Sequence, residues 1–374
     1  MRVACIHSSV VPSRAANSIQ IMKMAHAIAQ EGHQVLLVVP SMKPGQEPNV
    51  ADVFSFYGVS PLVRLVRAPW LPIKGRGVIF AILAVLRAWL FRPDVVYTRY
   101  ARAGYLAALF GLNVIYESHA PENGRAYSRM LRSRNLIRVV AISSALRDYL
   151  IRTHQLPGEK VIVAHDGADC IGSGVVGRSK DGFDVGYAGH LYEGKGMELI
   201  SELIRRCGWA RFHIIGGRQK EIAYWKERTA GASNVTFYGF VPNKEVHGLL
   251  VTMDALVAPY QPRVMSAMGQ DIAQWMSPLK IFEYMDAGVP IVASDLPVLR
   301  EILRDRFNAL LCDPLSADAW VAALEELRDD AELAMSLART ARQDLEERYT
   351  WRQRARAILQ GLTKTIVVRK NIAS

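Results

Sequence analysis

Residues 277–295, SPLKIFEYMDAGVPIVASD, combine the start of a helix with groups that can bind an anion. Ser277 is a favourable N-cap and Pro278 a favourable first helical residue, so the spacing predicts a helix that begins directly after a loop. The first turn of such a helix leaves backbone N–H groups unpaired and carries the positive end of the helix dipole. Leu279 and Lys280 lie in that turn, and their amides are candidates to bind an anion such as a phosphate.

Glu283 supplies a carboxylate within two turns of that helix start. A carboxylate there can accept hydrogen bonds from hydroxyl groups, for example those of a sugar. Gly288 is typical of the left-handed residue that ends a helix, and Ile291–Ala293 is predicted to be the strand that follows. Each residue taken alone fits a capped surface helix, and only their combination favours a ligand site.

A second segment, GYAGHLYEGKG at residues 186–196, is typical of a phosphate-binding loop. Gly189 lets the backbone approach a phosphate closely, and Lys195 supplies a positive charge. His190 adds an imidazole that is about neutral at pH 7. Because the loop follows a predicted strand, it is a stronger candidate than a lone glycine-rich stretch.

A third candidate is His119, in YESHAPE at residues 116–122, which follows another predicted strand. Two interpretations stay open for it. The ring can line a ligand site, or it can be a buried histidine that satisfies a local hydrogen bond.

A repeating order of strands and helices must position these segments. Short β-branched runs alternate with amphipathic stretches, beginning with the strand Arg2–His7 and the helix Ser18–Gln30, for which Ser18 is the predicted N-cap. Such alternation indicates parallel sheets covered by helices. The further predicted strands are Val35–Val39, Val95–Tyr97, Val114–Tyr116, Val139–Ile142, Val161–Ala164, Val185–Ala188, Phe212–Ile215, Val235–Phe237, Ala255–Ala258 and Ile291–Ala293.

The alternation is interrupted at residues 171–182, which are rich in glycine, serine and charge, as linkers are. We therefore predict an α/β protein of two consecutive units, each a doubly wound parallel sheet. Ligands in such folds bind at the carboxyl ends of the strands, and the expected place is a cleft between the two units.

Residues 277–295 resemble the donor-binding signature of the GT-B retaining glycosyltransferases of family 4, also described as glycosyl transferases group 1. The resemblance implies two Rossmann-like domains that face a cleft. It implies that Glu283 holds the ribose of a nucleotide-sugar and that Lys195 neutralises its diphosphate. His190 stands where arginine is common in the family. His119 matches the histidine that lines the donor-sugar site near the reacting carbon.

The resemblance extends over nearly the whole chain. It implies an acceptor-side domain at residues 1–172, a nucleotide-sugar domain at 173–350, and a C-terminal helix at 351–374 that returns to the first domain. The flanking acids Glu117 and Glu122 receive no catalytic role, because the family's retaining mechanism does not clearly require a carboxylate nucleophile. The residues implied to act in catalysis are His119, Lys195 and Glu283, and those implied to bind substrate are Asn17, Ser18, Gly189, His190, Phe240, Val241, Ser277, Leu279 and Lys280.

One departure from the family pattern concerns the donor sugar. The family often has a first glutamate eight positions before the second, and that position holds Trp275 here. The backbone amides near Leu279, or the nearby Asp271, are the candidates to replace it. The identity of the sugar therefore stays open.

Charge and composition narrow the partners. The 374 residues carry a net charge of +11, and nearly all of it lies in residues 1–172. This charge favours an anionic partner for the first half, and the alternative is that it serves solubility alone. No nucleic-acid-binding motif accompanies the charge, so nucleic acid is not expected. Four scattered cysteines without a C-x-x-C pair indicate a reducing compartment, and the N-terminus lacks the pattern of a signal peptide.

Residues 64–92 combine six basic residues with two tryptophans and the apolar run Val78–Phe91. That run has 14 residues, and a membrane-spanning helix needs about 20. Two interpretations stay open: an amphipathic segment that lies on an anionic lipid surface, or a core helix with Arg87 directed outward.

The resemblance implies a retaining glycosyltransferase, and we expect it to need no metal ion or cofactor, because no D-x-D pair or metal-ligand spacing occurs in the implied site. Its donor would be a nucleoside diphosphate sugar, such as a UDP- or GDP-sugar, and its acceptor a lipid-linked or surface-polysaccharide glycan of a bacterium. A cytoplasmic location is expected, with attachment to the inner face of the plasma membrane as an option. The alternatives are a nucleotide-sugar 2-epimerase of the same fold and a non-catalytic nucleotide- or partner-binding domain.

Overall fold

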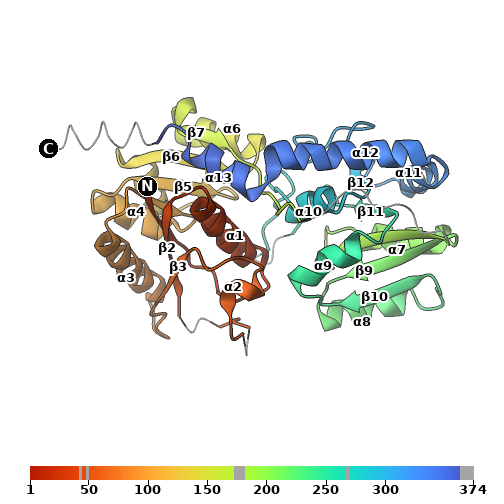
Figure 1. Cartoon of the computed structure of the whole chain (residues 1–374), viewed down its shortest axis with the longest axis horizontal. Helices are drawn as coiled ribbons and strands as arrows, with labels where there is room; N and C mark the ends of the chain where they lie inside the picture. The colour runs from red at the N-terminus through yellow and green to blue at the C-terminus, as the bar shows by residue number, and fades with distance from the viewer. Residues whose placement is uncertain (42–43, 48–49, 172–181, 266–268, 363–374) are drawn as a thin grey trace. The chain divides into compact units, whose positions relative to one another are not determined.

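The computed structural model describes residues 1–41, 44–47, 50–171, 182–265 and 269–362. The chain forms two compact units (Figure 1). Unit 1 comprises residues 1–166 and the segment from Trp351 onward, and unit 2 comprises Gly167–Thr350. Residues 172–181 of the predicted linker lie outside the described residues, and the division at Gly167 precedes the boundary expected at 172.

Unit 1 is built on a seven-stranded parallel sheet with the order β3-β2-β1-β4-β5-β6-β7. Its buried strands are continuous apolar runs, as a sheet covered on both faces requires. The strands are β1 (Arg2–Ile6), β2 (Gln34–Pro40), β3 (Arg64–Ala68), β4 (Val95–Thr98), β5 (Val114–Ser118), β6 (Leu136–Ala141) and β7 (Val161–Val163). The helices are α1 (Ala16–Gln30), α2 (Val53–Phe56), α3 (Arg76–Phe91), α4 (Ala101–Leu109), α5 (Arg125–Leu131), α6 (Ser144–His154) and α13 (Trp351–Leu359), with a short 3₁₀ turn at Gly158–Lys160.

Unit 2 repeats this plan with six parallel strands in the order β10-β9-β8-β11-β12-β13. The strands are β8 (Phe183–Ala188), β9 (Ala210–Ile215), β10 (Val235–Gly239), β11 (Ala255–Ala258), β12 (Ile291–Ser294) and β13 (Leu310–Cys312). The helices are α7 (Met197–Arg206), α8 (Gln219–Arg228), α9 (Asn243–Leu250), α10 (Leu279–Ala287), α11 (Ala317–Asp329) and α12 (Ala331–Asp344), followed by a π-helical turn at Leu345–Tyr349. The two apolar clusters of the unit lie on opposite faces of its sheet.

Both expected N-caps are wrong. Helix α1 begins at Ala16 with Ala15 at its N-cap, and the buried Ser18 hydroxyl donates instead to the carbonyl oxygen of Val10 at 2.6 Å. Helix α10 begins at Leu279 with Pro278 at its N-cap, so Ser277 lies before the helix. Gly288 ends α10 in the left-handed conformation (φ 64°), as predicted.

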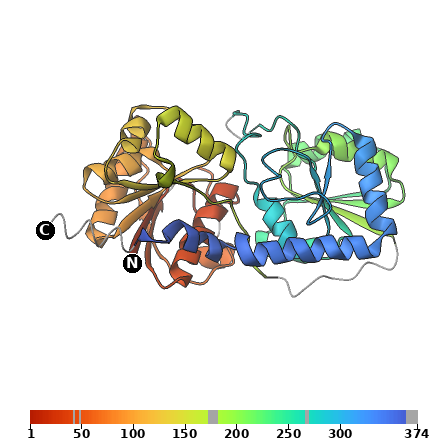
Figure 2. The same cartoon turned by 90° about the horizontal axis from the view of Figure 1, so that it is seen from above.

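Helix α13 belongs to unit 1 although it is the last described helix of the chain. Arg352 and Arg356 pair with Glu31 at the end of α1, at 2.9 Å and 2.5 Å. Figure 2 shows α13, in blue, beside the red α1. Arg138 of β6 also donates to the carbonyl oxygen of Ile358 at 2.6 Å. These contacts bring the C-terminal segment to the first domain's sheet.

Helix α3 has apolar side chains on two faces. Phe80, Ala81 and Ala84 belong to the buried face, and a second row, consisting of Val78, Ile82, Leu86, Trp89 and Leu90, is 38–70% exposed. The helix is therefore part of the core on one side and an exposed apolar surface on the other. Within the described residues, no helix is both long enough and apolar enough to cross a bilayer.

Candidate active site

Each sheet has one place where its strand order reverses. The chain leaves β1 toward β2 and β3, and then returns to β4 on the other side of β1; β8 and β11 form the corresponding pair in unit 2. Loops that follow such a pair diverge and leave room for a ligand at the carboxyl ends of the strands. Gly189, His190 and Lys195 all follow β8, and His119 follows β5 in the other sheet.

Two glycines in conformations that L side chains rarely adopt shape the loop after β8. Gly196, at the N-cap of α7, has φ +90°, and a Cβ there would lie 1.9 Å from the carbonyl oxygen of Pro259. Gly189 has φ +146°, and its amide donates to the carbonyl oxygen of Ile215 at 2.9 Å. The loop therefore packs closely against the segment that follows β11, with Lys195 directly before the start of α7.

Two lysine ammonium groups lie on the ring of Tyr260. The Nζ atom of Lys195 is 4.9 Å from the ring centroid, and that of Lys280 is 5.1 Å from it. Lys280 also lies 3.7 Å from the centroid of Tyr187, the last aromatic residue of β8. Burial lowers the pKa of Lys195 to about 8. Burial, and then the charge of Lys195, lower the pKa of Lys280 far below its ordinary value.

Helix α10 carries Glu283 and is attached to β8. The hydroxyl of Tyr284 accepts a hydrogen bond from the amide of Ala188 at 2.8 Å, which fixes the first turns of α10 against the end of that strand. Glu283 is half-buried in the second turn, and Leu279 is half-buried at its start. The structure thus brings Lys195, Lys280 and the first turn of α10 to the carboxyl edge of one sheet.

The other residues of unit 2 that are predicted to bind substrate differ in their exposure and contacts. His190 stacks on Tyr192 with 5.3 Å between ring centroids, and burial together with the Lys195 charge lowers its pKa, so the ring is neutral at pH 7. Phe240 is 45% exposed in the loop after β10, and Val241 next to it packs on the core. Ser277 is buried before α10.

Asp271 holds the loop in which the expected first glutamate is missing. Its Oδ1 atom accepts from the amides of Val264 at 3.1 Å and Ala273 at 3.0 Å. Trp275 is half-buried at the corresponding position. The carboxylate of Asp271 thus already serves as a brace for its own loop.

In unit 1, the ring of His119 is hydrogen-bonded to the fully buried carboxylate of Glu117. Its Nε2 atom lies 2.5 Å from Oε1 of Glu117, which also accepts from Nε2 of Gln20 at 2.6 Å. Burial, and then the charge of Arg99, lower the pKa of His119, so the ring is neutral at pH 7. Because an ionised carboxylate can only accept, Nε2 carries the ring proton and Nδ1 is left as an acceptor.

Arg354 of α13 neutralises that carboxylate. Its Nη1 atom is 3.0 Å from Oε2 of Glu117, and its other nitrogens donate to the carbonyl oxygens of His165 and Ala164 at 2.7 Å and 3.2 Å. Burial by itself would favour the protonated carboxyl, but the Arg354 charge and the His119 hydrogen bond lower the pKa of Glu117 to about 2. The C-terminal helix therefore holds the carboxylate that orients His119.

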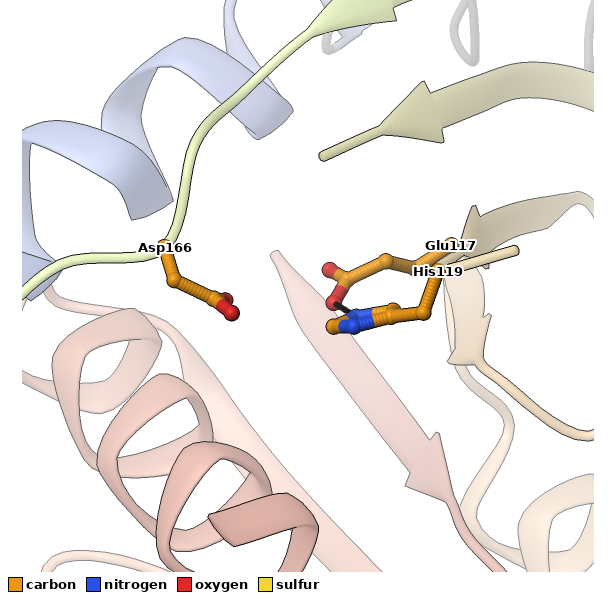
Figure 3. Close-up of side chains that lie close together, drawn as sticks. All are labelled: Glu117, His119 and Asp166. Carbon is orange, nitrogen blue, oxygen red and sulfur yellow. Dashed lines mark hydrogen bonds and ion pairs between the residues drawn. The ribbon is translucent and has the colours of Figure 1, made fainter. Parts of the chain in front are cut away.

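Glu117, His119 and Asp166 each offer an atom within 4.8 Å of the other two, a spacing that suits a metal ion (Figure 3). Arg354 also faces both acids, since its Nη2 atom lies 3.8 Å from Asp166. A guanidinium already supplies positive charge between the two carboxylates, which favours an ion-pair cluster over a metal site at this position.

The loop after β1 uses its polar side chains internally. Asn17 is exposed and donates from Nδ2 to the hydroxyl of Ser9 at 3.1 Å. Ser18 is fully buried beneath it, and its hydroxyl is engaged with Val10. Asn17 is thus the member of the predicted pair that a ligand can reach.

Sequence reasoning missed the Lys280 side chain, the tyrosines beneath it and Arg354. A signal for Arg354 existed, because helical spacing places it on the same face as Trp351, Ala355 and Ile358, and an arginine on an apolar face needs a buried partner. The partner itself, Glu117, lies 237 residues away. No local pattern connects the two.

The two sheets and their strand orders define the GT-B class of fold. Residues 182–330 match the family model of glycosyl transferases group 1, and residues 18–170 match that of glycosyltransferase family 4. The two matches together span most of the chain, which therefore belongs to the group 1, family 4 glycosyltransferases.

Individual relatives are distant. A glycogen synthase of Mycobacterium tuberculosis is 25% identical over 301 residues, which cover 73% of this chain and 69% of the relative. The structure of Anabaena HepE in complex with UDP and glucose is 16% identical, with a TM-score of 0.72 over 96% of this chain and 99% of HepE. The lipopolysaccharide outer core galactosyltransferase WaaB is 15% identical, with a TM-score of 0.69 over 97% of this chain and 100% of WaaB. The likeness of these two structures concerns the fold.

Proposed function

We propose that the protein transfers a sugar from a nucleoside diphosphate sugar to an acceptor hydroxyl, with retention of the anomeric configuration. The observation that carries this proposal is the pair of buried lysine side chains, Lys195 and Lys280, at the carboxyl edge of unit 2 in and beside the first turn of α10. The charge of Lys195 and the amides of the helix start, placed in advance at a dry site, stabilise the negative charge that develops on a leaving diphosphate. The complex of Anabaena HepE with UDP and glucose is consistent with such a donor.

In this proposal each unit has a separate task. Lys195 and the amides near Leu279 stabilise the diphosphate, and the carboxylate of Glu283 accepts hydrogen bonds from the ribose hydroxyls. In unit 1, Nδ1 of His119 accepts a hydrogen bond from a donor-sugar hydroxyl. The chemistry needs no metal ion or cofactor, since side chains and amides supply the positive charge.

A donor screen by thermal shift tests this assignment. UDP, GDP, ADP and their sugar conjugates are added without metal and in EDTA, and a ligand at about 100 times its dissociation constant stabilises by about 2.7 kcal/mol. We expect one nucleoside diphosphate to raise the melting temperature and Glu283→Gln to abolish that rise. Glu301→Gln, which changes a glutamate outside the proposed site, serves as the control. If none of these compounds raised the melting temperature, the proposed donor site would be refuted.

The stereochemistry is tested on the product. NMR of the product formed from an α-linked donor sugar should show an α-anomer, and a β-anomer would refute retention. A 2-epimerase would instead convert the donor sugar in the absence of any acceptor. A chain that binds the nucleotide but neither transfers nor converts the sugar would be the non-catalytic alternative.

We also propose that the acceptor is a lipid-linked glycan and that α3 places unit 1 on an anionic membrane surface, as expected for a cytoplasmic enzyme of the inner face. The support is the exposed apolar row of α3 in a segment that has six exposed basic residues and no acid between Asp52 and Asp94. Apolar side chains rimmed by positive charge are the features with which proteins bind anionic lipid. WaaB, which shares the fold, is a lipopolysaccharide outer core galactosyltransferase, and this is consistent with such an acceptor.

Sedimentation with vesicles tests the membrane proposal. Binding to vesicles with anionic lipid should exceed binding to neutral vesicles, and Leu86→Glu combined with Leu90→Glu should weaken it at least about tenfold, because each leucine contributes about 1.5–3 kcal/mol when buried. Leu315→Glu, at an exposed leucine of unit 2, is the matched control. Equal binding by both variants would contradict the assignment to α3.

A further inference from the structure

Lys280 is a buried lysine whose side-chain nitrogen has no hydrogen-bond partner among the described residues. Its side chain is 8% exposed, and its Nζ atom makes no hydrogen bond with any residue that the structure describes. A lysine ammonium has three donors, and leaving them unpaired in a buried place is unfavourable. The contacts it does make are with the faces of Tyr187 and Tyr260.

A second ammonium lies on the same ring. Lys195 is also close to Tyr192, with 5.3 Å between its Nζ atom and the ring centroid. Two like charges at a dry site destabilise each other, so the pair is stable only when one group loses its proton or an anion binds. Lys280 is the group for which burial and the neighbouring charge act together, and its neutral form is therefore favoured in the free protein.

The groups that face Lys280 come from several elements. Glu283, on α10 itself, favours the charged form, and Lys195 opposes it. The remaining titratable groups around the pair are Tyr187 of β8, His190 and Tyr192 of the loop after β8, Tyr260 after β11 and Tyr284 of α10. His190 is neutral at pH 7 and adds no charge. A ligand that neutralises both lysines must therefore supply more than one negative charge.

The backbone of the loop after β8 passes close to Lys280. At Gly189 a Cβ would lie 3.0 Å from Nζ of Lys280, so only a glycine brings the loop after β8 to this distance without contact. The start of α10, the loop after β8 and the segment after β11 all converge there, at the point where the strand order reverses.

We propose that the side chain of Lys280 is a second phosphate-binding group, which takes up a proton from solvent when a diphosphate binds beside Lys195. The inference rests on the proposed function and extends it, because it assigns a role to the side chain where the sequence pointed only to the backbone amide. On binding, the neutral amine of Lys280 becomes an ammonium and pairs with an ionised phosphate oxygen. Donor affinity is thereby linked to pH.

Calorimetry on the full chain tests the inference. UDP, or the nucleoside diphosphate selected by the donor screen, is titrated at pH 7.5 in Hepes and in Tris, whose ionisation enthalpies differ, so the difference in heat measures protons taken up. The diphosphate is fully ionised at that pH, since a phosphate's second pKa is about 6. We expect proton uptake on binding, and an affinity that falls by up to about tenfold per pH unit as the pH rises from 7.5 to 9.

Variants assign the proton to Lys280. Lys280→Met should lower the affinity for the diphosphate at least about tenfold and reduce proton uptake, while binding of the parent nucleoside stays unchanged. Lys280→Arg keeps a charge that does not titrate, so binding should persist with a weaker dependence on pH. Lys226→Met, at an exposed lysine of α8, is the matched control, and circular dichroism checks the fold of each variant.

The outcomes separate this inference from the function on which it rests. If the wild-type protein binds the diphosphate but Lys280→Met changes neither affinity nor proton uptake, the inference is overturned and the donor site stands. If no nucleotide binds the wild-type protein, the proposed function fails and the inference fails with it.

Discussion

The ion pair between Arg354 and Glu117 ties the C-terminal helix to unit 1, and its removal should be costly. The Glu117 side chain is fully buried, and the Arg354 charge and the His119 hydrogen bond lower its pKa from the ordinary 4.5 to about 2. At about 1.36 kcal/mol for each pKa unit, the surrounding groups stabilise the folded carboxylate by about 3 kcal/mol. Since the folded pKa is the lower one, this contribution is fully present above pH 4.5 and is lost as the pH falls toward 2.

Arg354→Met leaves this carboxylate buried with only neutral partners. Removing one partner of a buried ion pair lowers the free energy of unfolding by about 3–5 kcal/mol. For a unit of this size, each kcal/mol corresponds to about 2–4 °C in melting temperature. Differential scanning calorimetry at pH 7 measures the shift, with Glu117→Gln and the double variant completing a cycle. We expect a coupling free energy of about 3 kcal/mol between the two positions.

Arg356→Met is the matched control, because Arg356 is on the same helix and pairs with Glu31 at the surface. Exposed ion pairs contribute little to stability, so this variant should melt close to the wild type. Equal shifts in melting temperature for Arg354→Met and Arg356→Met would refute the reasoning. So would a stability loss in the Arg354→Met, Glu117→Gln double variant that equals the sum of the two single losses.

Three further changes have expected outcomes. Gly196→Ala should prevent nucleotide binding and lower stability, because a Cβ would overlap the carbonyl oxygen of Pro259; a thermal shift equal to that of the wild type would contradict it. Tyr284→Phe should cost about 1–3 kcal/mol in urea unfolding, since the amide of Ala188 loses its acceptor. Glu117→Gln should reduce the transfer rate without changing nucleotide affinity, because His119 loses the carboxylate that orients it; an unchanged rate would mean that Glu117 serves stability alone.

The strands in the middle of both sheets could be predicted from sequence, and two edge strands could not. Central parallel strands such as β1 and β8 are buried on both faces, so they are continuous apolar runs. Strand β3, RLVRA, lies at a sheet edge, half-exposed and bounded by arginines. Strand β13 lies at the edge of the other sheet and has three residues. Edge strands need no long apolar run, and the pattern on which the prediction depended is therefore absent.

The residues of the candidate site likewise fall into those that the sequence identifies and those that only the structure shows. Lys195 and Glu283 occur in segments whose local chemistry already indicates a ligand, so the sequence identifies them as candidates. The orientation of Lys280 depends instead on how α10 packs on β8, through Tyr284 and Ala188, which are 96 residues apart in the chain. Contacts of that range follow from the packing of the whole unit and leave no mark on the local sequence.

Lys280 and Arg354 are both buried basic residues, yet their substitution should change stability in opposite directions. Arg354 is neutralised by a carboxylate 3.0 Å away, so the protein itself provides its counter-ion, and Arg354→Met is destabilising. Lys280 has no hydrogen-bond partner among the described residues and shares an aromatic ring with another lysine. Lys280→Met should therefore raise the stability of the ligand-free protein by about 1–3 kcal/mol while it weakens the response to nucleotide. A thermal melt of both variants, with and without the nucleoside diphosphate, makes the comparison. A fall in the melting temperature of ligand-free Lys280→Met would show that the lysine stabilises the folded protein. A rise would show that the lysine lowers the stability of the ligand-free protein and that its role is to bind the ligand.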